Sequence, residues 1–348
     1  MKKIALIGNY GIIGQPAYDG QTIKTRIVAQ ELKHQYGETE LIFINTYGGF
    51  VNLFKSPFQC LKAIFSASNI LIQPDVNGIR VYAPILFVLS FLFRHKKLHY
   101  SVIGGWLPTF VKKRPILKYV LKHFQCIYVE TNTMLCALQE QGFKNIYLMP
   151  NFKNLNIVTK EQLKNATTHP LKLCIFSRIN KEKGVADAVD IVNRINLKCG
   201  RPIYSLDIYG KIDPLQQNWF DQLQSSFSEH ISYKGVVDYN KSVDVLKDYF
   251  ALLFPTHYYT EGIPGTIIDA YAAGLPVISS KWQSFSDIID DKSTGLGYEF
   301  DNINQLEEIL ITIANNPDII NNLKHNCILK AEEYLPTKAI LPLINNVD

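Results

Sequence analysis

The sequence predicts an α/β protein built from two doubly wound domains, each with a parallel sheet. Short, continuous apolar runs alternate with stretches of helical periodicity, as expected of parallel strands covered on both faces. This alternation is interrupted by a polar stretch around residues 154–170, rich in Asn, Lys and Thr, and then starts again. A length of 348 residues suits about two domains.

The first half begins with an apolar run that ends in glycine, Lys3–Gly8, which predicts the first strand. Apolar residues then recur at helical spacing over Thr22–Tyr36. Further strands are expected at Glu40–Ile44, Asn69–Gln73, His99–Ile103, Gln125–Glu130 and Ile146–Met149. The longest apolar run, Val81–Phe93, falls short of the roughly 20 residues of a membrane span and predicts a buried helix.

The second half repeats the pattern. Strands are expected at Lys172–Phe176, Tyr204–Tyr209, Ile231–Gly235, Ala251–Phe254 and Pro276–Ser279, with helices at 184–198, 214–227 and 264–273. We therefore expect a Rossmann-like domain over residues 1–153, a linker over 154–170, a second Rossmann-like domain over 171–330, and a segment 331–348 that packs back on the first. Two such domains are expected to face each other across a ligand cleft.

Charge and cysteine content indicate the kind of partner and the cellular compartment. Residues 1–153 hold 18 Lys and Arg against seven Asp and Glu, a net charge of +11, whereas residues 154–348 carry −6. This asymmetry favours an anionic partner for the first half, although halves of a chain often differ by several charges. The six cysteines are scattered without metal-ligand spacing, which is typical of reduced thiols in a cytoplasmic protein.

The most informative stretch follows the strand expected at Ala251–Phe254. A loop delivers Glu261 to the start of a helix, where unpaired backbone N–H groups form an anion site. The residues expected at this entrance are Gly262, Ile263, Pro264, Gly265 and Thr266. Asp269 follows eight residues after Glu261, a spacing suited to holding two ends of one ligand. Alternatively, Glu261 only balances the helix dipole and Asp269 is an exposed helix residue.

Two cations follow the strand expected at Lys172–Phe176. Arg178 and Lys183 lie where the carboxyl end of a sheet meets a turn, the position expected for ligand contacts. Arg presents a planar fork to phosphate oxygens and Lys a movable point charge, so the two would neutralise a diphosphate. The alternative is a pair of surface charges balanced by Glu182.

Taken together, these residues resemble the donor-site motifs of glycosyltransferase family 4, a group of retaining enzymes with GT-B architecture. The motifs are Arg178 with Lys183-Gly184, Tyr233–Val236, Pro255 with Glu261–Pro264, and Ala272–Val277. The resemblance implies that Arg178 and Lys183 bind the diphosphate of a nucleotide-sugar donor and that Glu261 contacts the transferred sugar. It implies that Asp269, where the family has Glu, binds the ribose.

The first half matches this family less well. A Gly-Gly turn before the first helix is replaced by Asp19-Gly20, where Gly20 still permits close approach of the diphosphate. Where many members carry a His, this chain has Ile103-Gly104-Gly105-Trp106, and Trp106 is either a ring platform for a sugar or a core residue. No Asp-x-Asp motif occurs, which favours chemistry without metal or other cofactor.

A basic amphipathic helix is expected over Phe110–His123, with Lys112, Lys113 and Arg114 on its polar side. Such a helix suits an anionic membrane surface, although an ordinary solvated helix shows the same pattern. The resemblance therefore implies a glycan or polyprenyl-diphosphate-linked acceptor, used in the synthesis of a cell-surface polysaccharide such as a capsule. We expect a cytoplasmic protein, peripheral on the inner face of the membrane, with no nucleic-acid partner.

Two other classes of function remain. A nucleotide-sugar epimerase of the same architecture would release free sugar without an acceptor, and a sugar phosphorylase would need a pyridoxal-phosphate lysine that no motif marks. A non-catalytic protein that binds an anionic polymer or a membrane surface would use the basic first half. Its difficulty is that the better-formed site lies in the acidic half.

Overall fold

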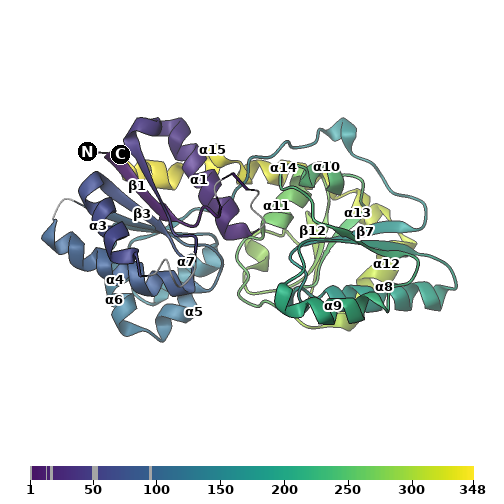
Figure 1. Cartoon of the computed structure of the whole chain (residues 1–348). Helices are drawn as coiled ribbons and strands as arrows, with labels where there is room; N and C mark the ends of the chain where they lie inside the picture. The colour runs from purple at the N-terminus through teal and green to yellow at the C-terminus, as the bar shows by residue number, and fades with distance from the viewer. Residues whose placement is uncertain (1, 13, 16–18, 49–53, 94–95) are drawn as a thin grey trace. The chain divides into compact units, whose positions relative to one another are not determined.

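The computed structural model describes residues 2–12, 14–15, 19–48, 54–93 and 96–348 and divides the chain into two compact units. Unit 1 comprises residues 1–154 and 334–348, and unit 2 comprises residues 155–333. Each unit contains a six-stranded parallel sheet with helices on both faces (Figure 1). Residues 155–170, expected as a linker, belong to unit 2, where the Val158 N–H donates to the carbonyl of Ala272 at 2.8 Å.

The sheet of unit 1 has the strand order β2-β1-β3-β4-β5-β6. Its strands are β1 (Lys2–Gly8), β2 (Leu41–Asn45), β3 (Ala67–Gln73), β4 (Lys97–Ser101), β5 (Cys126–Val129) and β6 (Ile146–Leu148). Side chains of β1 alternate between the two faces, as a strand requires. Ile4 and Leu6 face one core cluster, and Ala5 and Ile7 face the other.

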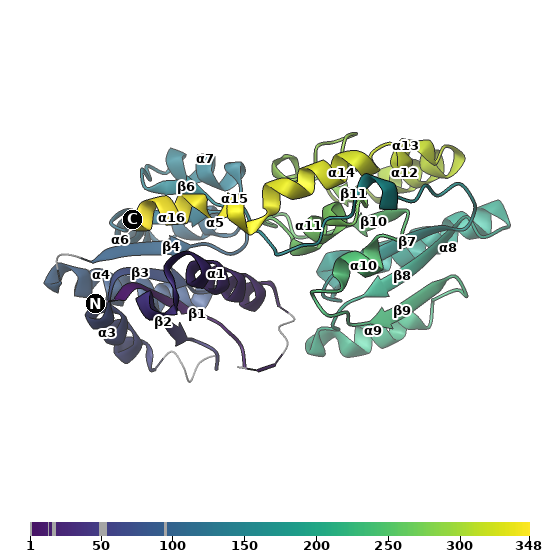
Figure 2. The same ribbon diagram turned by 90° about the horizontal axis from the view of Figure 1, so that it is seen from above.

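Helices cover both faces of this sheet. On one face lie α1 (Gly20–Tyr36) and the C-terminal α15 (Pro336–Ala339) and α16 (Leu341–Val347). The other face is covered by α3 (Ser56–Ser66), α4 (Val76–Leu92), α5 (Leu107–Lys112), α6 (Pro115–Lys122) and α7 (Asn132–Glu140). The C-terminal segment therefore completes the core of unit 1, and Figures 1 and 2 both show the two chain ends in this unit. The Lys3 ammonium pairs with the carboxylate of Asp348.

Two expectations about these helices are wrong. The helix expected over Phe110–His123 is divided into α5 and α6, because Pro115 forces the residue before it out of the helical region. Arg114 accordingly has φ −139° and ψ 79°. The apolar run Val81–Phe93 lies in α4 but is only half buried, since Phe91 is 62% exposed and Leu92 is 71% exposed.

The sheet of unit 2 has the strand order β12-β11-β10-β7-β8-β9. Its strands are β7 (Leu171–Phe176), β8 (Tyr204–Tyr209), β9 (Ile231–Gly235), β10 (Ala251–Phe254), β11 (Val277–Ser280) and β12 (Gly295–Tyr298). One face carries α8 (Val185–Cys199), α9 (Gln217–Gln224), α12 (Ile303–Asn315) and α13 (Asp318–Asn321), and the other carries α10 (Ser242–Leu246), α11 (Gly265–Ala272) and α14 (Lys324–Ala331).

The six cysteines form no disulfide: Cys136 and Cys199 are exposed, and the other four are buried. Within the described ranges, no helix is both long enough and apolar enough to cross a membrane.

Candidate functional site

The sheet of unit 2 has a topological switch point between β7 and β10. From β7 the chain runs outward through β8 and β9, whereas β10 is followed by β11 and β12 on the opposite side. The loops after two such strands diverge at the carboxyl edge and leave a crevice, where open α/β sheets bind their ligands. The loops after β7 and β10 carry the two motifs singled out from the sequence.

An ion pair joins these two motifs. The Lys183 ammonium lies 2.7 Å from Oε2 of Glu261, although the two residues are 78 positions apart in the chain. The side chains are only 15% and 20% exposed, so the surrounding protein partly shields their charges from water. The structure thus brings the expected diphosphate-binding lysine and the expected sugar-binding carboxylate into one site.

Two aromatic rings complete the surroundings of Lys183. Its ammonium lies 5.2 Å from the ring centroid of Phe254 and 5.0 Å from that of Tyr258. Rings at such distances attract a cation through their electron-rich faces. The ammonium is therefore held among a carboxylate and two rings at the carboxyl end of β10.

Local backbone geometry makes this arrangement possible. Asn180 accepts a hydrogen bond from the Lys183 N–H at 3.0 Å and begins a short 3₁₀ turn, η3 (Lys181–Lys183). Gly184 follows in the left-handed region with φ 68°. A Cβ at Gly184 would lie 1.9 Å from the carbonyl oxygen of Pro255, so only glycine lets the β7 loop approach the β10 loop this closely.

The end of β11 supports the loop 255–264. The Ser279 hydroxyl donates to the carbonyl of Phe254 at 2.8 Å, and the Ser280 hydroxyl donates to that of Thr256 at 2.6 Å. Both serines are buried. The loop therefore begins on a fixed base one strand away from β7.

His257 ties the same loop to two further elements. Its Nε2 lies 2.7 Å from Asp187 in the first turn of α8, and its Nδ1 lies 2.6 Å from Asp301, which precedes α12. Partial burial opposes the charged imidazolium, but the hydrogen bonds to Asp301 and Asp187 outweigh it and raise the pKa of His257. His257 thus joins the loop of Glu261 to both helices through charge.

Helix α11 begins directly after this loop. Pro264 is its N-cap residue and no side chain caps it. The hydroxyl oxygen of Thr266 is buried without a hydrogen-bond partner among the described residues. Asp269 is 2% exposed, so it is not the exposed helix residue that was one interpretation of the sequence. The structure places all residues expected at the helix entrance in this one loop and first turn.

Arg178 also lies at this edge, two residues after β7, and is exposed. Among the described residues it forms no ion pair. Its positive charge acts on Tyr258, whose pKa is nevertheless raised, chiefly by burial. The pairing of these cations with Glu182, the alternative interpretation, is not what the structure shows, because the Glu182 carboxylate instead accepts from Gln216 at 3.1 Å.

Two of the residues expected from the sequence, Gly20 and Trp106, lie in unit 1, each at the beginning of a helix. Gly20 is the first residue of α1, whose N-cap Asp19 accepts from the Thr22 N–H at 2.9 Å. A Cβ at Gly20 would meet no described atom within 4 Å, so the described fold itself does not demand glycine there. Trp106 is half-buried and donates its ring N–H to the carbonyl of Ile103 at 2.8 Å, which closes the turn before α5.

The basic residues of unit 1 follow at the end of α5. Lys112 and Lys113 are exposed, and the guanidinium of Arg114 lies 3.7 Å from the ring centroid of Phe110. These three residues are therefore at the surface where α5 gives way to α6.

A buried ion pair that no sequence motif predicts lies at the carboxyl edge of the unit 1 sheet. The Lys24 ammonium lies 2.5 Å from Glu130 and donates to the carbonyl of Val102 at 3.2 Å, with both charged side chains at most 3% exposed. The two residues are 106 positions apart, and no local pattern links them. His257 was also missed, although a lone His in the loop just before Glu261 was a signal that could have been used.

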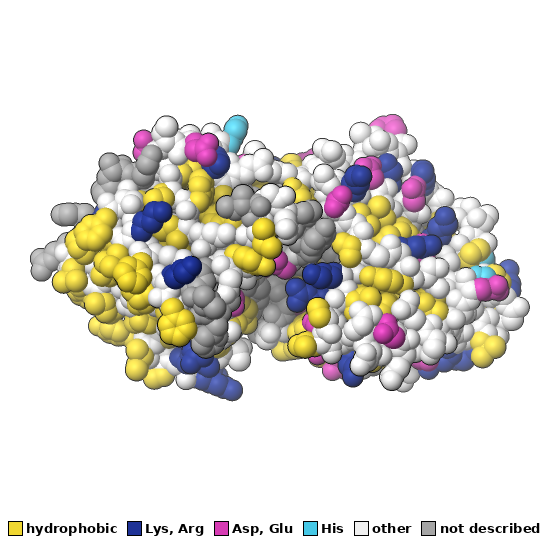
Figure 3. All heavy atoms as spheres, in the orientation of Figure 1, with side chains coloured by type: hydrophobic (Ala, Val, Ile, Leu, Met, Phe, Trp, Pro, Cys, Tyr) yellow, Lys and Arg dark blue, Asp and Glu magenta, His cyan; other side chains and the backbone are white. Residues whose placement is uncertain are grey.

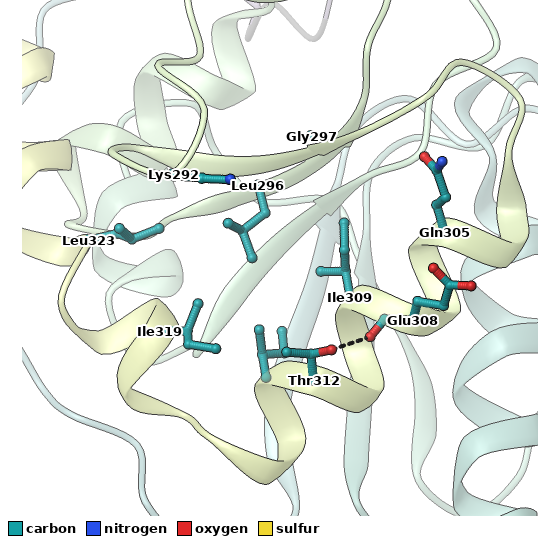
Figure 4. Close-up of a pocket in the computed structure, with 10 residues that line it drawn as sticks. Lys292, Leu296, Gly297, Gln305, Glu308, Ile309, Thr312, Ile319 and Leu323 are labelled. Carbon is teal, nitrogen blue, oxygen red and sulfur yellow. Dashed lines mark hydrogen bonds between the residues drawn. The ribbon is translucent and has the colours of Figure 1, made fainter.

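A cavity of about 540 Å³ lies elsewhere in unit 2, beside the edge strand β12 and under α12 and α13 (Figure 4). Leu296, Ile309 and Ile319 line it, and Lys292 and Glu308 lie at its margin. The Thr312 hydroxyl donates to the carbonyl of Glu308 in its own helix at 2.8 Å, so this hydroxyl is already used within the helix. Among the described residues, no group of three His, Cys, Asp or Glu side chains is placed to hold a metal ion.

Comparison with solved structures shows the fold. The chain is similar to a sucrose-phosphate synthase from Thermosynechococcus elongatus, with a TM-score of 0.79 and 16% identity over 100% of this chain and 98% of the other. It is similar to Anabaena HepE, solved in complex with UDP, with a TM-score of 0.72 and 13% identity over 99% and 98%. The lipopolysaccharide outer core galactosyltransferase WaaB gives 0.68 and 16% over 100% and 99%.

These similarities, together with the two six-stranded parallel sheets, fit the GT-B fold, which consists of two Rossmann-like domains. A search of curated proteins finds no significant match. Residues 159–334, which include every residue of the Lys183–Glu261 site, match the family described as Glycosyl transferases group 1. Because this match covers half of the chain, the protein belongs to the group 1 glycosyl transferases.

Proposed function

We propose that the chain is a retaining family 4 enzyme that moves a sugar from a nucleotide-diphosphate sugar to a glycan or polyprenyl-diphosphate-linked acceptor. The observation that carries the proposal is the ion pair of Lys183 and Glu261, placed at the switch point between β7 and β10. In this proposal it acts in the cytoplasm, in the synthesis of a cell-surface polysaccharide.

Each charged group has a proposed role in donor binding. Arg178 and Lys183 neutralise the diphosphate, and the backbone N–H groups of Gly262, Gly265 and Thr266 bind its oxygens at the uncapped start of α11. Without donor, Glu261 balances the charge of Lys183. When the diphosphate takes over this role, the carboxylate becomes free to accept hydrogen bonds from the hydroxyl groups of the sugar.

The other expected residues complete the proposed site. Asp269 binds the ribose, for which its buried carboxylate must become accessible to the nucleotide. Gly20 admits the diphosphate at the start of α1, and Trp106 lies on the acceptor side.

The proposed reaction breaks the bond between the anomeric carbon and the phosphate oxygen. The acceptor hydroxyl forms the new bond from the same face, and its proton passes to the departing phosphate oxygen. Because positive side chains and helix N–H groups stabilise the charge that develops on this oxygen, the protein lowers the barrier without a metal. The absence of an Asp-x-Asp motif from the sequence supports this part of the proposal.

The nucleotide is best tested with UDP first, because HepE was solved in complex with UDP. We expect one of UDP, GDP, ADP or dTDP to stabilise the protein in thermal unfolding, since a ligand at 100 times its Kd adds about 2.7 kcal/mol. The matching nucleotide sugar is then incubated with and without an oligosaccharide acceptor. Transfer that requires the acceptor supports the proposal, whereas complete conversion to free sugar without it indicates an epimerase. No stabilisation by any nucleotide contradicts the donor site.

A further inference from the structure

Three helices of unit 1 expose apolar side chains on one connected surface. The residues concerned, called the apolar surface below, are Phe58 and Phe65 on α3, Val88, Phe91 and Leu92 on α4, and Ile116 and Tyr119 on α6. Each of them is between 58% and 78% exposed. Figure 3 shows hydrophobic side chains gathered over this part of unit 1. Single apolar residues scattered over a surface are common, whereas apolar residues that lie together in one exposed patch mark an interaction site.

The residues of the apolar surface are not part of the hydrophobic core of unit 1. The opposite sides of the same helices already supply the core through residues such as Ala63, Leu86 and Leu117. On α3, Phe58 and Phe65 are seven positions apart and share one side of the helix. On α6, Ile116 and Tyr119 share the outer side in the same way. These helices are therefore apolar on both sides, which packing within unit 1 does not require.

Aromatic contacts make the surface continuous across the helices. The ring of Phe65 lies 4.9 Å from that of Phe93, which follows α4. Phe87 on α4 lies 4.9 Å from Phe91 and 6.0 Å from Tyr119 on α6. Ring contacts therefore link α3 to the end of α4, and α4 to α6.

The charges around this surface are almost all positive. Helices α3, α4, α5 and α6 contain no Asp or Glu. Residues 54–123 hold eleven Lys and Arg and one acidic residue, Asp75, which caps the N-terminus of α4. Lys62 lies between Phe58 and Phe65 on α3, and Lys112 and Lys113 are exposed beside α6. The partner must accordingly present apolar material together with negative charge.

We propose that this surface of unit 1 docks on a lipid bilayer that contains anionic headgroups. Phe and Leu side chains would enter the boundary between headgroups and acyl chains, while the lysines contact the headgroups. A second copy of the chain is disfavoured, because two such surfaces would bring like charges together. The inference rests on the surface of unit 1 alone and adds a membrane partner to the proposed transfer reaction. It also changes the expectation from sequence, since attachment becomes apolar as well as electrostatic.

The test is flotation of the full-length chain with vesicles of phosphatidylcholine alone or mixed with phosphatidylglycerol. We expect binding to the mixed vesicles that weakens with salt, as surface charges become screened. The variant Phe58→Ser/Phe91→Ser/Ile116→Ser should lower the partition coefficient at least about tenfold. Lys62→Ser/Lys112→Ser/Lys113→Ser should lower it by a similar factor at low salt.

A matched control is available in unit 2, where Leu197 and Leu215 are 84% and 95% exposed. Leu197→Ser/Leu215→Ser should bind vesicles as the unchanged chain does. Circular dichroism and nucleotide binding, measured on every variant, report folding and the donor site separately from vesicle binding. Equal binding to neutral and mixed vesicles overturns the proposal. So does unchanged binding of the apolar triple variant, or self-association of the unchanged chain that this variant abolishes.

Discussion

At the scale of single residues, the position of the Lys183 ammonium is set by the side chains around it. Its ammonium contacts the Glu261 carboxylate and lies over two rings, so replacing it removes a cation from a partly shielded site. Lys183→Ala and Arg178→Ala should each weaken nucleotide-diphosphate binding by about 1.5–3 kcal/mol, the value of a hydrogen bond to a charged group. Isothermal titration with the free nucleotide diphosphate measures this.

Lys181 supplies the matched control, because it lies in the same 3₁₀ turn and is exposed. Lys181→Ala should leave the affinity almost unchanged. If all three variants bind equally well, Arg178 and Lys183 do not hold the diphosphate.

His257 gives a prediction about pH. Its pKa in the folded protein is raised by Asp301 and Asp187 against the effect of partial burial. A raised pKa means that the folded state binds the proton more tightly than the unfolded state. The resulting stability is fully present below about pH 6.5, the ordinary value for His, and is lost as the pH rises through the folded pKa.

His257→Gln should therefore destabilise the protein more at pH 6 than at pH 9, as measured by urea unfolding. His34→Gln is the control, since His34 is exposed on α1 and has no ion pair among the described residues. A destabilisation by His257→Gln that is the same at both pH values would show that the two carboxylates do not hold a charged imidazolium.

At the scale of secondary-structure elements, the two ends of α8 allow a comparison of glycines. Gly184 and Gly200 flank the helix, and both adopt the left-handed region, with φ of 68° and 62°. A Cβ at Gly184 would lie 1.9 Å from the Pro255 carbonyl oxygen, whereas a Cβ at Gly200 would meet no described atom within 4 Å. A side chain at either position therefore carries the cost of a left-handed backbone, but only a side chain at Gly184 would also clash with Pro255.

Gly200→Ala should lower the free energy of unfolding by about 1 kcal/mol, the cost of a left-handed non-glycine residue. Gly184→Ala should cost clearly more, because the loops after β7 and β10 must separate, and it should also weaken nucleotide binding. Urea unfolding and titration calorimetry provide the two measurements. Equal losses of stability would mean that the close approach of the loops is not needed.

Strands and helices were predictable from the sequence where their pattern of apolar residues matches the burial of those residues in the structure. Strand β10 is a continuous apolar run and is buried throughout, whereas β8 alternates between buried apolar and half-buried positions. The structure forms both strands at the expected bounds. Helix α3 was not predicted, because its exposed Phe58 and Phe65 obscure the periodicity of its buried side. Strand β12 was also missed, since two of its four residues are glycine.

The candidate site was predictable in part for the same reason. Glu261 and Lys183 stand out because each follows a strand that the sequence marks clearly. The partners of His257 and the Lys24–Glu130 pair were not predictable, because folding brings together residues that are far apart in the chain. The division between α5 and α6 was readable in principle from Pro115.

At the scale of the whole molecule, the charges are divided between the two units. Unit 1 carries a net charge of +11 and unit 2 carries −6. The acidic unit nevertheless contains the site proposed for an anionic donor, so Arg178, Lys183 and the N–H groups of α11 must outweigh the charge around them. In the proposed function, this local arrangement, more than net charge, would determine where the donor binds.

Transfer activity is accordingly expected to persist in EDTA. In the proposed mechanism, protein cations and helix N–H groups balance the charge of the departing diphosphate. Activity with the donor and acceptor identified above is compared before and after addition of the chelator. Loss of activity in EDTA that magnesium or manganese restores would contradict transfer without metal.

The most direct test of the account is the steady-state kinetics of Glu261→Gln. Because an interaction that strengthens as the glycosidic bond breaks lowers the barrier, its loss should reduce kcat by about 10²–10³-fold with the donor KM little changed. Asp269→Asn should instead raise the donor KM with a smaller change in kcat, since the ribose does not react. A folded Glu261→Gln protein with near-normal kcat would contradict the placement of the active site between β7 and β10.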